Sequence, residues 1–470
     1  MKFWFKLALA LYLFACKSIA QTYFNNSYEI GGIAHGSTSV LDDSVGYLVL
    51  GQEITTSYRA MSFVKTDYSG DTIWTKSFPQ NQFAYYTGYS NSLIRTNDNK
   101  IAFGGTIINL LDSTDSGNAL LVKLNNSADT LWMKMYGGSG LDVANITIQS
   151  ADSGFVLIGA TTSYGSGQSD FYMVKTDSLG GFQWQKTFGT SAQEEAYSGI
   201  KTLDNGYLLT GHQSGQMYIV KTDEDGNFQW ERTIAGSAGQ GFIQQFADST
   251  YVLVGSKFVT GLSYQAYITK LTKTGATIWE QTYGGIGDQQ LFAVPIILSD
   301  GSVVCSGVVS SGSPQGILIK VDSSGNEKWM RTYYKGSIYN DLFDLKLTTD
   351  NGFVMTGTTY LSTQDSWLIK VDSAGCEIAN CNVGVNESEI QKPKLNIFPV
   401  PARDEITILI EGEDMDDYEI TVFNILGETL KTSIENTKIS ISNFAAGVYF
   451  ISAKSKKNQN RTVQKIIIEK

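Results

Sequence analysis

The sequence predicts an all-β protein: a seven-bladed β-propeller closed by its N-terminal strand, followed by a small C-terminal β-sandwich. Two repeated signals carry this prediction. In the first, an apolar run with Lys, Asp and Gly leads to a Trp four residues after the Gly. The second is a polar turn, a short apolar strand and a glycine, and its copies end at Gly51, Gly104, Gly159, Gly211, Gly255, Gly307 and Gly357. A period near 50 residues is typical of repeat architectures.

The repeated tryptophan marks the last strand of each repeat, and its copies are Trp74, Trp132, Trp184, Trp230, Trp279 and Trp329. A large ring on an outer strand can cover the glycine turn of a neighbouring sheet and seal the interface between the two sheets. The skeleton resembles the tryptophan-docking repeat of quinoprotein-type propellers, although here the Asp lies seven residues before the Trp rather than eight. The resemblance covers the repeat pattern and no cofactor site, so no cofactor is expected.

Each repeat reads as two hairpins, or four short strands that we call A to D. In the third repeat the expected ranges are 144–150, 154–163, 170–177 and 182–188. The turns between them carry Asp, Ser and Gly, which accept positive φ or bond their own backbone. Antiparallel sheets of this kind suit a propeller, because radial closure leaves only short strand edges. An open β-solenoid is the alternative arrangement.

Residues 22–28 read as a D strand with no A, B or C strand before it. Phe24 and Tyr28 have the spacing of a repeat Trp and the aromatic residue that usually follows it four positions later. The last repeat, in turn, has Ala379 where a seventh Trp would stand. The two defects are complementary, and a solenoid would have no use for them. We therefore expect the N-terminal strand to complete the seventh sheet, within a propeller spanning residues 21–381.

The first 20 residues have the features of a secretory signal peptide: a basic start, an apolar stretch and a small residue, Ala20, before the expected cleavage site. Lipoprotein processing at Cys16 is the alternative, which bulky Phe14 disfavours. The apolar stretch is too short to span a bilayer, and we expect no transmembrane segment in the mature chain. The net charge of −11 argues against nucleic-acid binding, because phosphate backbones require clustered Lys and Arg.

The cysteines, histidines and repeated lysines suggest structural roles. Cys305 lies in an apolar strand and is expected to be a small buried side chain. Cys376 and Cys381 are close together in an exported chain, which suits a local disulfide. His35 and His212 are far apart, so no metal site is expected. A lysine recurs near the end of each C strand, with its head expected in water, at Lys65, Lys123, Lys175, Lys221, Lys270, Lys320 and Lys370.

The repeats stop after Asp372, and a polar segment at 382–394 reads as a linker. Residues 395–470 alternate apolar strands with glycine turns, as in a small β-sandwich. This stretch resembles the type A sorting domain of the type IX secretion system of Bacteroidetes-type bacteria. The resemblance lies in the motifs FPVPA (398–402), VFNILG (422–427), GVYF (447–450) and KIIIEK (465–470), with Val400 where the family usually has Asn. It implies a partnership with that secretion machinery, export across the outer membrane, and release or attachment at the cell surface.

A ligand face is predicted from the loop positions. In a four-stranded antiparallel blade the D–A and B–C connections emerge on the same face, and propellers usually bind ligands where such loops converge. Tyrosine, carboxylate and amide groups there suit a carbohydrate or protein ligand, because the ring stacks and the polar groups hydrogen-bond. The candidate residues are Asp142, Glu194, Asp288, Asn340, Asp341, Tyr164, Tyr264 and Tyr360.

Three functions fit these features. The first is a secreted or surface-displayed module that binds a ligand without catalysis, such as an adhesin, and we favour it. The second is an extracellular glycoside hydrolase or polysaccharide lyase, which would need two loop carboxylates facing each other. The third is a structural protein of the cell envelope. No catalytic motif is recognisable, since neither histidine lies near a nucleophile motif.

Overall fold

The computed structural model describes residues 22–30, 34–43, 45–55, 58–78, 82–285, 287–310, 312–335, 338–378, 395–410, 417–424, 428–431, 437–456 and 461–470. The expected signal peptide, the expected linker, Cys16 and Cys381 lie outside these ranges. The chain divides into two compact units, Met1–Cys381 and Asn382–Lys470, which we call unit 1 and unit 2 and describe separately. In the described residues, no helix has the length and apolar character needed to cross a membrane.

Unit 1 consists of antiparallel groups of mostly four strands, and β1 is Phe24–Tyr28. The first three groups are β2 (Ala34–Asp43), β3 (Gly46–Ile54), β4 (Arg59–Thr66) and β5 (Thr72–Ser77); β6 (Phe83–Thr87), β7 (Leu93–Arg95), β8 (Ile101–Asn109), β9 (Asn118–Leu124) and β10 (Thr130–Tyr136); and β11 (Asp142–Gln149), β12 (Phe155–Thr161), β13 (Asp170–Thr176) and β14 (Phe182–Phe188). In the third group every strand lies within two residues of its expected range.

The remaining groups follow the same order. They are β15 (Glu194–Lys201), β16 (Tyr207–Gln213), β17 (Gln216–Thr222) and β18 (Phe228–Ile234); β19 (Ser237–Gln245), β20 (Tyr251–Val259), β21 (Ser263–Leu271) and β22 (Thr277–Tyr283); β23 (Asp288–Leu291), β24 (Ile296–Ile297), β25 (Val303–Ser310), β26 (Gln315–Val321) and β27 (Glu327–Tyr333); and β28 (Asn340–Leu347), β29 (Phe353–Tyr360) and β30 (Gln364–Val371). Where the first strand is split, both halves pair with the second strand, as β6 and β7 do with β8.

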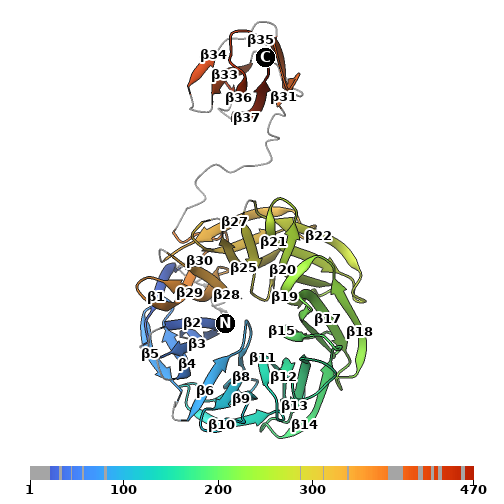
Figure 1. The fold of residues 1–470 in the computed structure, drawn as a ribbon. Coiled ribbons are helices and arrows are strands. Elements are labelled where there is room, and N and C mark those ends of the chain that lie inside the picture. Colours follow the sequence, from blue (N-terminus) through green and yellow to red (C-terminus); the bar gives the residue numbers. More distant parts are fainter. Residues whose placement is uncertain are drawn as a thin grey trace, which may run out of the picture. The chain divides into compact units, whose positions relative to one another are not determined.

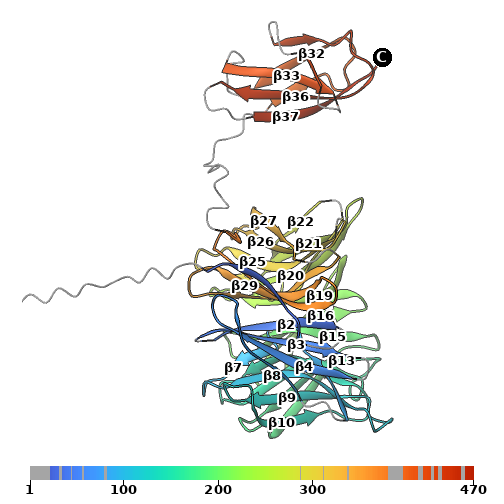
Figure 2. The ribbon, with the colours of Figure 1, turned by 90° about the vertical axis from the view of Figure 1, so that its left-hand side faces the viewer.

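The groups lie around a common centre (Figure 1), with first strands such as β2, β11, β15 and β28 innermost and last strands such as β5, β10, β14 and β18 at the rim. Figure 2 shows them side-on, with their loops emerging at two opposite faces of unit 1. The buried apolar side chains form clusters between neighbouring groups; one, for example, joins Ile158 of β12 to Leu209 of β16. The architecture is therefore all-β and propeller-like.

The first and last groups meet through the N-terminal strand. β1 pairs antiparallel with β30, with Phe24 opposite Lys370 and Tyr28 opposite Ser366. A parallel bridge from Ala34 of β2 to Gln364 of β30 joins the two groups into one eight-stranded sheet. The strand that the sequence assigns to the last sheet therefore pairs there, and it supplies that sheet's outer edge.

Tryptophans connect most groups to the next by covering a glycine. A Cβ atom added to Gly226, for example, would lie 2.8 Å from the ring of Trp184. The glycine has φ of +75°, which L-residues with side chains rarely adopt, so both conformation and space favour glycine. The same contact, at 2.8 to 3.1 Å, recurs at Trp132/Gly180, Trp230/Gly275, Trp279/Gly325, Trp329/Gly375 and, with a phenylalanine, Phe24/Gly70.

A tyrosine four residues after the ring donates a second contact to the same turn. Tyr28 Oη donates to the carbonyl of Gly70 at 2.7 Å, just as Tyr136 donates to Gly180 at 2.7 Å. Equivalent bonds join Tyr283 to Gly325 and Tyr333 to Gly375. Since β1 belongs to the last group and Gly70 to the first, β1 contacts the first group as β10, β22 and β27 contact the groups that follow them.

The sequence suggested that the heads of the repeated lysines lie in water, but in the structure they form ion pairs. Lys175 of β13 contacts Asp152 in the turn between β11 and β12 at 2.7 Å, and also donates to the carbonyl of Thr176. The other pairs are Lys65–Asp43, Lys123–Asp98, Lys221–Asp204, Lys270–Asp248, Lys320–Asp300 and Lys370–Asp350. An ammonium group this close to the sheet needs an anion, because burying a lone charge is costly, and the turn aspartate supplies it.

These pairs predict a loss of stability in acid. Burial opposes ionisation of Asp152, but hydrogen bonds from Lys175 and Ser150 outweigh it and lower its pKa to about 2. The pKa of Asp98 is also below its usual 3.8, chiefly because Lys123 donates to it. A carboxyl group whose pKa is lower in the folded than in the unfolded state stabilises the folded protein at pH values above the unfolded-state pKa. This contribution is lost as the pH falls through the folded-state pKa.

We therefore expect the thermal midpoint of unit 1, measured by circular dichroism, to fall as pH is lowered from about 4 to about 2. In the Asp152→Asn variant the decline should be shallower, since one of the titrating groups has been removed. A midpoint that stays constant across this interval would contradict the prediction.

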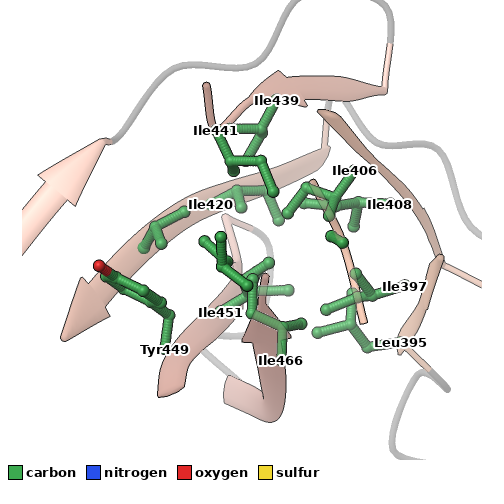
Figure 3. Close-up of a cluster of buried hydrophobic side chains, with 14 of the residues drawn as sticks. Leu395, Ile397, Ile406, Ile408, Ile420, Ile439, Ile441, Tyr449, Ile451 and Ile466 are labelled. Carbon is green, nitrogen blue, oxygen red and sulfur yellow. The ribbon is translucent and has the colours of Figure 1, made fainter. Parts of the chain in front are cut away.

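Unit 2 contains two sheets. The three-stranded sheet has the order β31-β32-β35 and the four-stranded sheet β34-β33-β36-β37. The strands are β31 (Leu395–Phe398), β32 (Glu405–Ile410), β33 (Tyr418–Asn424), β34 (Thr429–Lys431), β35 (Lys438–Ser440), β36 (Gly447–Ser455) and β37 (Arg461–Ile468). Isoleucines from both sheets, among them Ile408, Ile420 and Ile466, point into one shared core (Figure 3). This is the packing expected of a small sandwich.

Candidate functional site

Several of the predicted loop residues bind neighbouring loops rather than facing outward. Asp142, at the start of β11, is fully buried, and its carboxylate accepts hydrogen bonds from the amide of Gly138 and the hydroxyls of Thr161 and Ser163. The first two partners lie before β11 and at the end of β12. Asp142 therefore ties a D–A connection to the B–C connection beside it.

The same position has this role in other groups. Glu194 is fully buried and accepts from Thr190 and from Gln213 Nε2. Asn340 is buried and contacts the amide of Lys335 and the carbonyl of Pro314. Asp288 is half-buried and accepts from Ser263 Oγ and the amide of Tyr264. The sequence pattern did not reveal that these side chains hold neighbouring loops together.

The three predicted tyrosines are each 37% exposed. The ring of Tyr164 stacks on Tyr172 and its hydroxyl donates to the carbonyl of Gly137. The ring of Tyr264 packs edge-on against Phe258. Tyr360, at the end of β29, lines a cavity. Of the three, Tyr360 is therefore placed where a ligand could contact it inside a cavity.

Asp341 is the one predicted carboxyl with a strongly perturbed acidity. Burial raises its pKa to about 6, and a hydrogen bond with Tyr339 opposes this only in part. It lies on β28 between Tyr339 and Phe343, which both line the same cavity as Tyr360. Its Oδ1 atom is buried and has no hydrogen-bond partner.

Three adjoining cavities lie at the end of unit 1 where the D–A and B–C connections emerge. The first has a volume of about 520 Å³, the second 460 Å³ and the third 310 Å³. Thr38 and Gln52 line both the first and the second, and Leu141, Val143 and Glu195 line both the first and the third. We call the three together the groove. It passes from β28 and β29 across β2, β6 and β11 to β15.

The groove combines rings with neutral polar groups. Its aromatic side chains include Tyr86, Tyr89, Tyr339, Phe343 and Tyr360. Its polar side chains include Thr38, Gln52, Thr106, Asn145, Thr162, Gln168, Gln193 and Gln364. Among the described residues that line it, Glu195 is the single carboxylate. This composition is suited to a ligand rich in hydroxyl or amide groups and low in charge.

Glu195 lies in a hydrogen-bonded cluster near the centre of unit 1. Asn145 Nδ2 donates to Oε1 of Glu195 at 3.2 Å, and Tyr197 Oη donates to Oε2 at 3.0 Å. The ring of Tyr197 stacks on His212 and meets Tyr89 edge-on. Burial lowers the pKa of His212, against the opposing charge of Glu195. The imidazole is therefore neutral near pH 7 and acts as a packed ring.

The centre of unit 1 is bridged by hydrogen bonds. Asp344 of β28 is fully buried and accepts from Ser39 Oγ at 3.1 Å, from the amide of Val40 at 2.9 Å and from Ser90 Oγ at 2.6 Å. Lys346 contacts the same carboxylate at 2.8 Å. One side chain of the last group thus holds β2 of the first group and the segment between β6 and β7.

The groove residues Gln52, Tyr89, Asn145 and Glu195 were missed from the sequence. They lie on or beside the strands themselves rather than on the loops where ligand residues were sought. The repeat pattern could have indicated these residues, because it fixes which positions fall on the innermost strand of a group or at the end of its second strand. Their exposure depends on the twist of each sheet, which the repeat pattern does not reveal.

No group of three or more His, Cys, Asp and Glu side chains suited to a metal ion occurs in the described residues. Cys305 is fully buried, and burial raises the pKa of its thiol. Cys376 is disulfide-bonded, while its expected partner, Cys381, lies outside the described ranges.

Residues 396–469 match the family of secretion system C-terminal sorting domains. This confirms the sorting domain that the sequence motifs predict, and the match describes that domain rather than the whole chain. The protein is thus exported by the type IX secretion system to the cell surface or beyond it. The domain implies an interaction with the secretion machinery.

Several solved structures are similar to this chain. They include a protein of unknown function from Dyadobacter fermentans (10% identity, 62% of this chain and 100% of that one, TM-score 0.41) and PorZ, an essential surface component of the type IX secretion system of Porphyromonas gingivalis (9%, 92% and 81%, 0.31). A PL25 polysaccharide lyase, an ulvan lyase, also matches (8%, 74% and 96%, 0.46). TM-scores below 0.5 carry no argument about function. A comparison with curated proteins finds no match.

Proposed function

We propose that the mature protein is a seven-bladed β-propeller, closed by its N-terminal strand, which binds an extended ligand in the groove without chemical catalysis. The ligand we favour is a glycan of low charge, presented to the protein at or outside the cell surface. In this proposal residues 21–381 form the propeller, residues 1–20 are a signal peptide, residues 382–394 are a linker and residues 395–470 direct export.

Closure is supported by contacts that repeat around the whole unit. Phe24 covers Gly70 as Trp329 covers Gly375, and Tyr28 donates to the Gly70 carbonyl as Tyr333 donates to that of Gly375. A solenoid would leave its first group without a predecessor. Asp344 adds hydrogen bonds from the last group to Ser39 and Val40 of the first.

The observation that carries the binding proposal is the continuity of the three cavities. A single cavity of 310 to 520 Å³ suits a small molecule, whereas cavities that share lining residues suit a chain of several units. The ring of Tyr86 is half-buried, with the guanidinium of Arg59 5.2 Å from its centre, and its other face can stack on a sugar ring. Gln52 and Asn145 can hydrogen-bond hydroxyl groups.

Binding is favoured over hydrolysis because of the carboxylate count. Glycoside hydrolases usually place two carboxyl groups on either side of the scissile bond, about 5 to 10 Å apart. The described lining of the groove supplies Glu195, and both of its oxygens accept hydrogen bonds from Asn145 and Tyr197. A carboxylate held in this way positions neighbouring groups rather than acting alone as acid and base.

A glycan array probed with the purified residues 21–381 tests the proposal. We expect binding to a defined set of neutral or weakly charged oligosaccharides. Tyr86→Ala and Gln52→Ala should each weaken it by about tenfold or more, since each loses a stacking or hydrogen-bonding contact. Tyr264→Ala is the matched control: this ring is exposed on the same face but lines none of the three cavities, and binding should be unchanged.

Absence of binding to any glycan, or equal loss in the Tyr264→Ala control, would overturn the proposal. If the immobilised glycans were instead shortened or cleaved by the protein, the enzyme alternative would replace it. Isothermal titration with the best glycan then gives the dissociation constant for each variant.

A further inference from the structure

Two buried acidic side chains face each other where the third and fourth groups of unit 1 meet. Asp170 is the first residue of β13 and Glu194 the first of β15, and their exposed fractions are 2% and 0%. A Cβ atom at Gly189 would lie 2.5 Å from Oδ1 of Asp170 and 2.8 Å from Oε2 of Glu194. The two oxygens therefore converge on one small space, which the absence of a side chain at residue 189 leaves open.

In each carboxylate, one oxygen accepts hydrogen bonds from the protein and the other oxygen faces this space. Oδ2 of Asp170 accepts from the amides of Ser166 and Gly167, at 3.0 and 3.3 Å. Oε1 of Glu194 accepts from Thr190 Oγ1 at 2.7 Å and from Gln213 Nε2 at 3.0 Å. Oε2 of Glu194 is buried and has no hydrogen-bond partner.

No lysine or arginine compensates the two charges. Neither residue takes part in an ion pair in the described residues, and residues 82–285, which include every loop around them, are described in full. Burial raises the pKa of Asp170, and the charge of Glu194 adds to the effect. Two carboxylates buried side by side are strongly unfavourable unless a cation or a shared proton lies between them.

Equivalent positions between other groups avoid this conflict. Around Gly137 the two converging side chains are Asn118 and Asp142, and around Gly284 they are Gln265 and Gln289. At least one member of each of these two pairs is a neutral amide, so two like charges do not meet there. The pair between the third and fourth groups differs by carrying two acids in the same geometry.

We propose that Asp170 and Glu194 bind a divalent cation of the Ca²⁺ type. Two carboxylates balance a double positive charge, and Ca²⁺ prefers oxygen ligands from side chains, backbone carbonyls and water. Because the described residues hold no group of three acidic or soft side chains, carbonyl oxygens and water supply the remaining ligands. This proposal is independent of the ligand assigned to the groove.

The ion would join two loops next to the groove. Asp170 ends the connection from β12 to β13, and Glu194 ends the connection from β14 to β15. Their chain neighbours Ser169 and Gln193 form a parallel bridge with each other and line the third cavity. A cation held by Asp170 and Glu194 therefore fixes the end of the groove at β15.

Calcium addition to the purified propeller tests the proposal. After treatment with EDTA, millimolar Ca²⁺ should raise the thermal midpoint by about 2–4 °C, because an ion that binds only the folded state stabilises it. Tb³⁺ serves as a second probe, since tyrosine excitation sensitises its emission at close range. Burial and Glu231 are the main causes that raise the pKa of Tyr218, and the charges of Glu194 and Asp170 add to them, so this ring lies close to both carboxylates.

The variants Asp170→Asn and Glu194→Gln should abolish both responses. Asp170→Asn recreates the amide and acid pair already present at Asn118 and Asp142, so this variant is expected to fold, and in EDTA its midpoint should equal or exceed that of the native protein. Asp152→Asn is the control: this aspartate belongs to the same group but pairs with Lys175, and both responses should persist.

Three outcomes would overturn the proposal. The native protein could show neither a Ca²⁺-dependent midpoint nor Tb³⁺ emission. Either response could survive unchanged in Asp170→Asn and Glu194→Gln. Finally, a midpoint insensitive to Ca²⁺ that rises from pH 7 to pH 5 would identify a shared proton, not a metal ion, between the two carboxylates.

Discussion

Removal of residues 22–28 is expected to cause the largest loss of stability, with a fall in the thermal midpoint of about 10 °C or more. β1 buries Phe24 and Tyr28 in a cluster with Val40 and Val49 of the first group and Leu368 of the last. Truncating a buried phenylalanine alone typically costs about 3–5 kcal/mol. Deletion also removes the antiparallel pairing with β30 and the hydrogen bond to Gly70.

The deletion can be tested by complementation. A synthetic peptide of residues 21–30, added to the truncated propeller, should restore much of the lost midpoint because it can pair with β30 again. A Ser27→Ala peptide should act equally well, since Ser27 is only half-buried. A Phe24→Ala peptide should fail. A truncated protein that melts within 2 °C of the native one would refute the proposed closure.

The Asp344→Ala substitution is expected to have the second-largest effect, a loss of about 3–5 kcal/mol. The side chain is fully buried and accepts hydrogen bonds from two hydroxyls and one amide, besides contacting Lys346. Its removal leaves the amide of Val40 and the hydroxyl of Ser90 without this acceptor and the ammonium of Lys346 without its anion. A buried polar group left without a partner destabilises the folded state by more than the net stabilisation that one hydrogen bond provides.

Denaturant unfolding followed by fluorescence measures this loss. Asp344→Asn should cost less than Asp344→Ala, because its amide oxygen still accepts some of these hydrogen bonds, although Lys346 loses its anion in this variant too. Asp225→Ala, which truncates an exposed turn aspartate, should stay within about 0.5 kcal/mol of the native protein. Equal midpoints for Asp344→Ala and Asp225→Ala would show that the central network contributes nothing measurable.

The repeat signals were sufficient to predict the strands and the place of β1. Gly180 and Trp132, for instance, follow from spacing alone, and the structure brings them together. The contacts between side chains of different repeat elements could be found only from the three-dimensional structure. Nothing in the spacing of Lys175 and Asp152 indicates an ion pair, because Lys175 lies on β13 and Asp152 in the turn before β12, and only the register of these two strands brings them together.

Of the residues predicted from the sequence for a ligand site, Tyr360 lines the groove, whereas most of the acidic ones do not. The loops around Asp142 and Glu194 do lie at the end where the cavities open, yet both carboxylates face inward. Acidic residues in glycine-rich loops look alike in sequence whether they bind a ligand or a neighbouring amide. Their orientation depends on donors such as Thr161 and Gln213, which are about 20 residues away.

The pairing of β1 with β30 also has a consequence for biogenesis. β1 is synthesised before its partner strand β30, whose residues Lys370 and Ser366 lie about 340 residues later. Contacts so distant in sequence form slowly. The newly made chain must therefore keep β1 unpaired until β30 has been synthesised, and during this time β1 is open to proteases and chaperones.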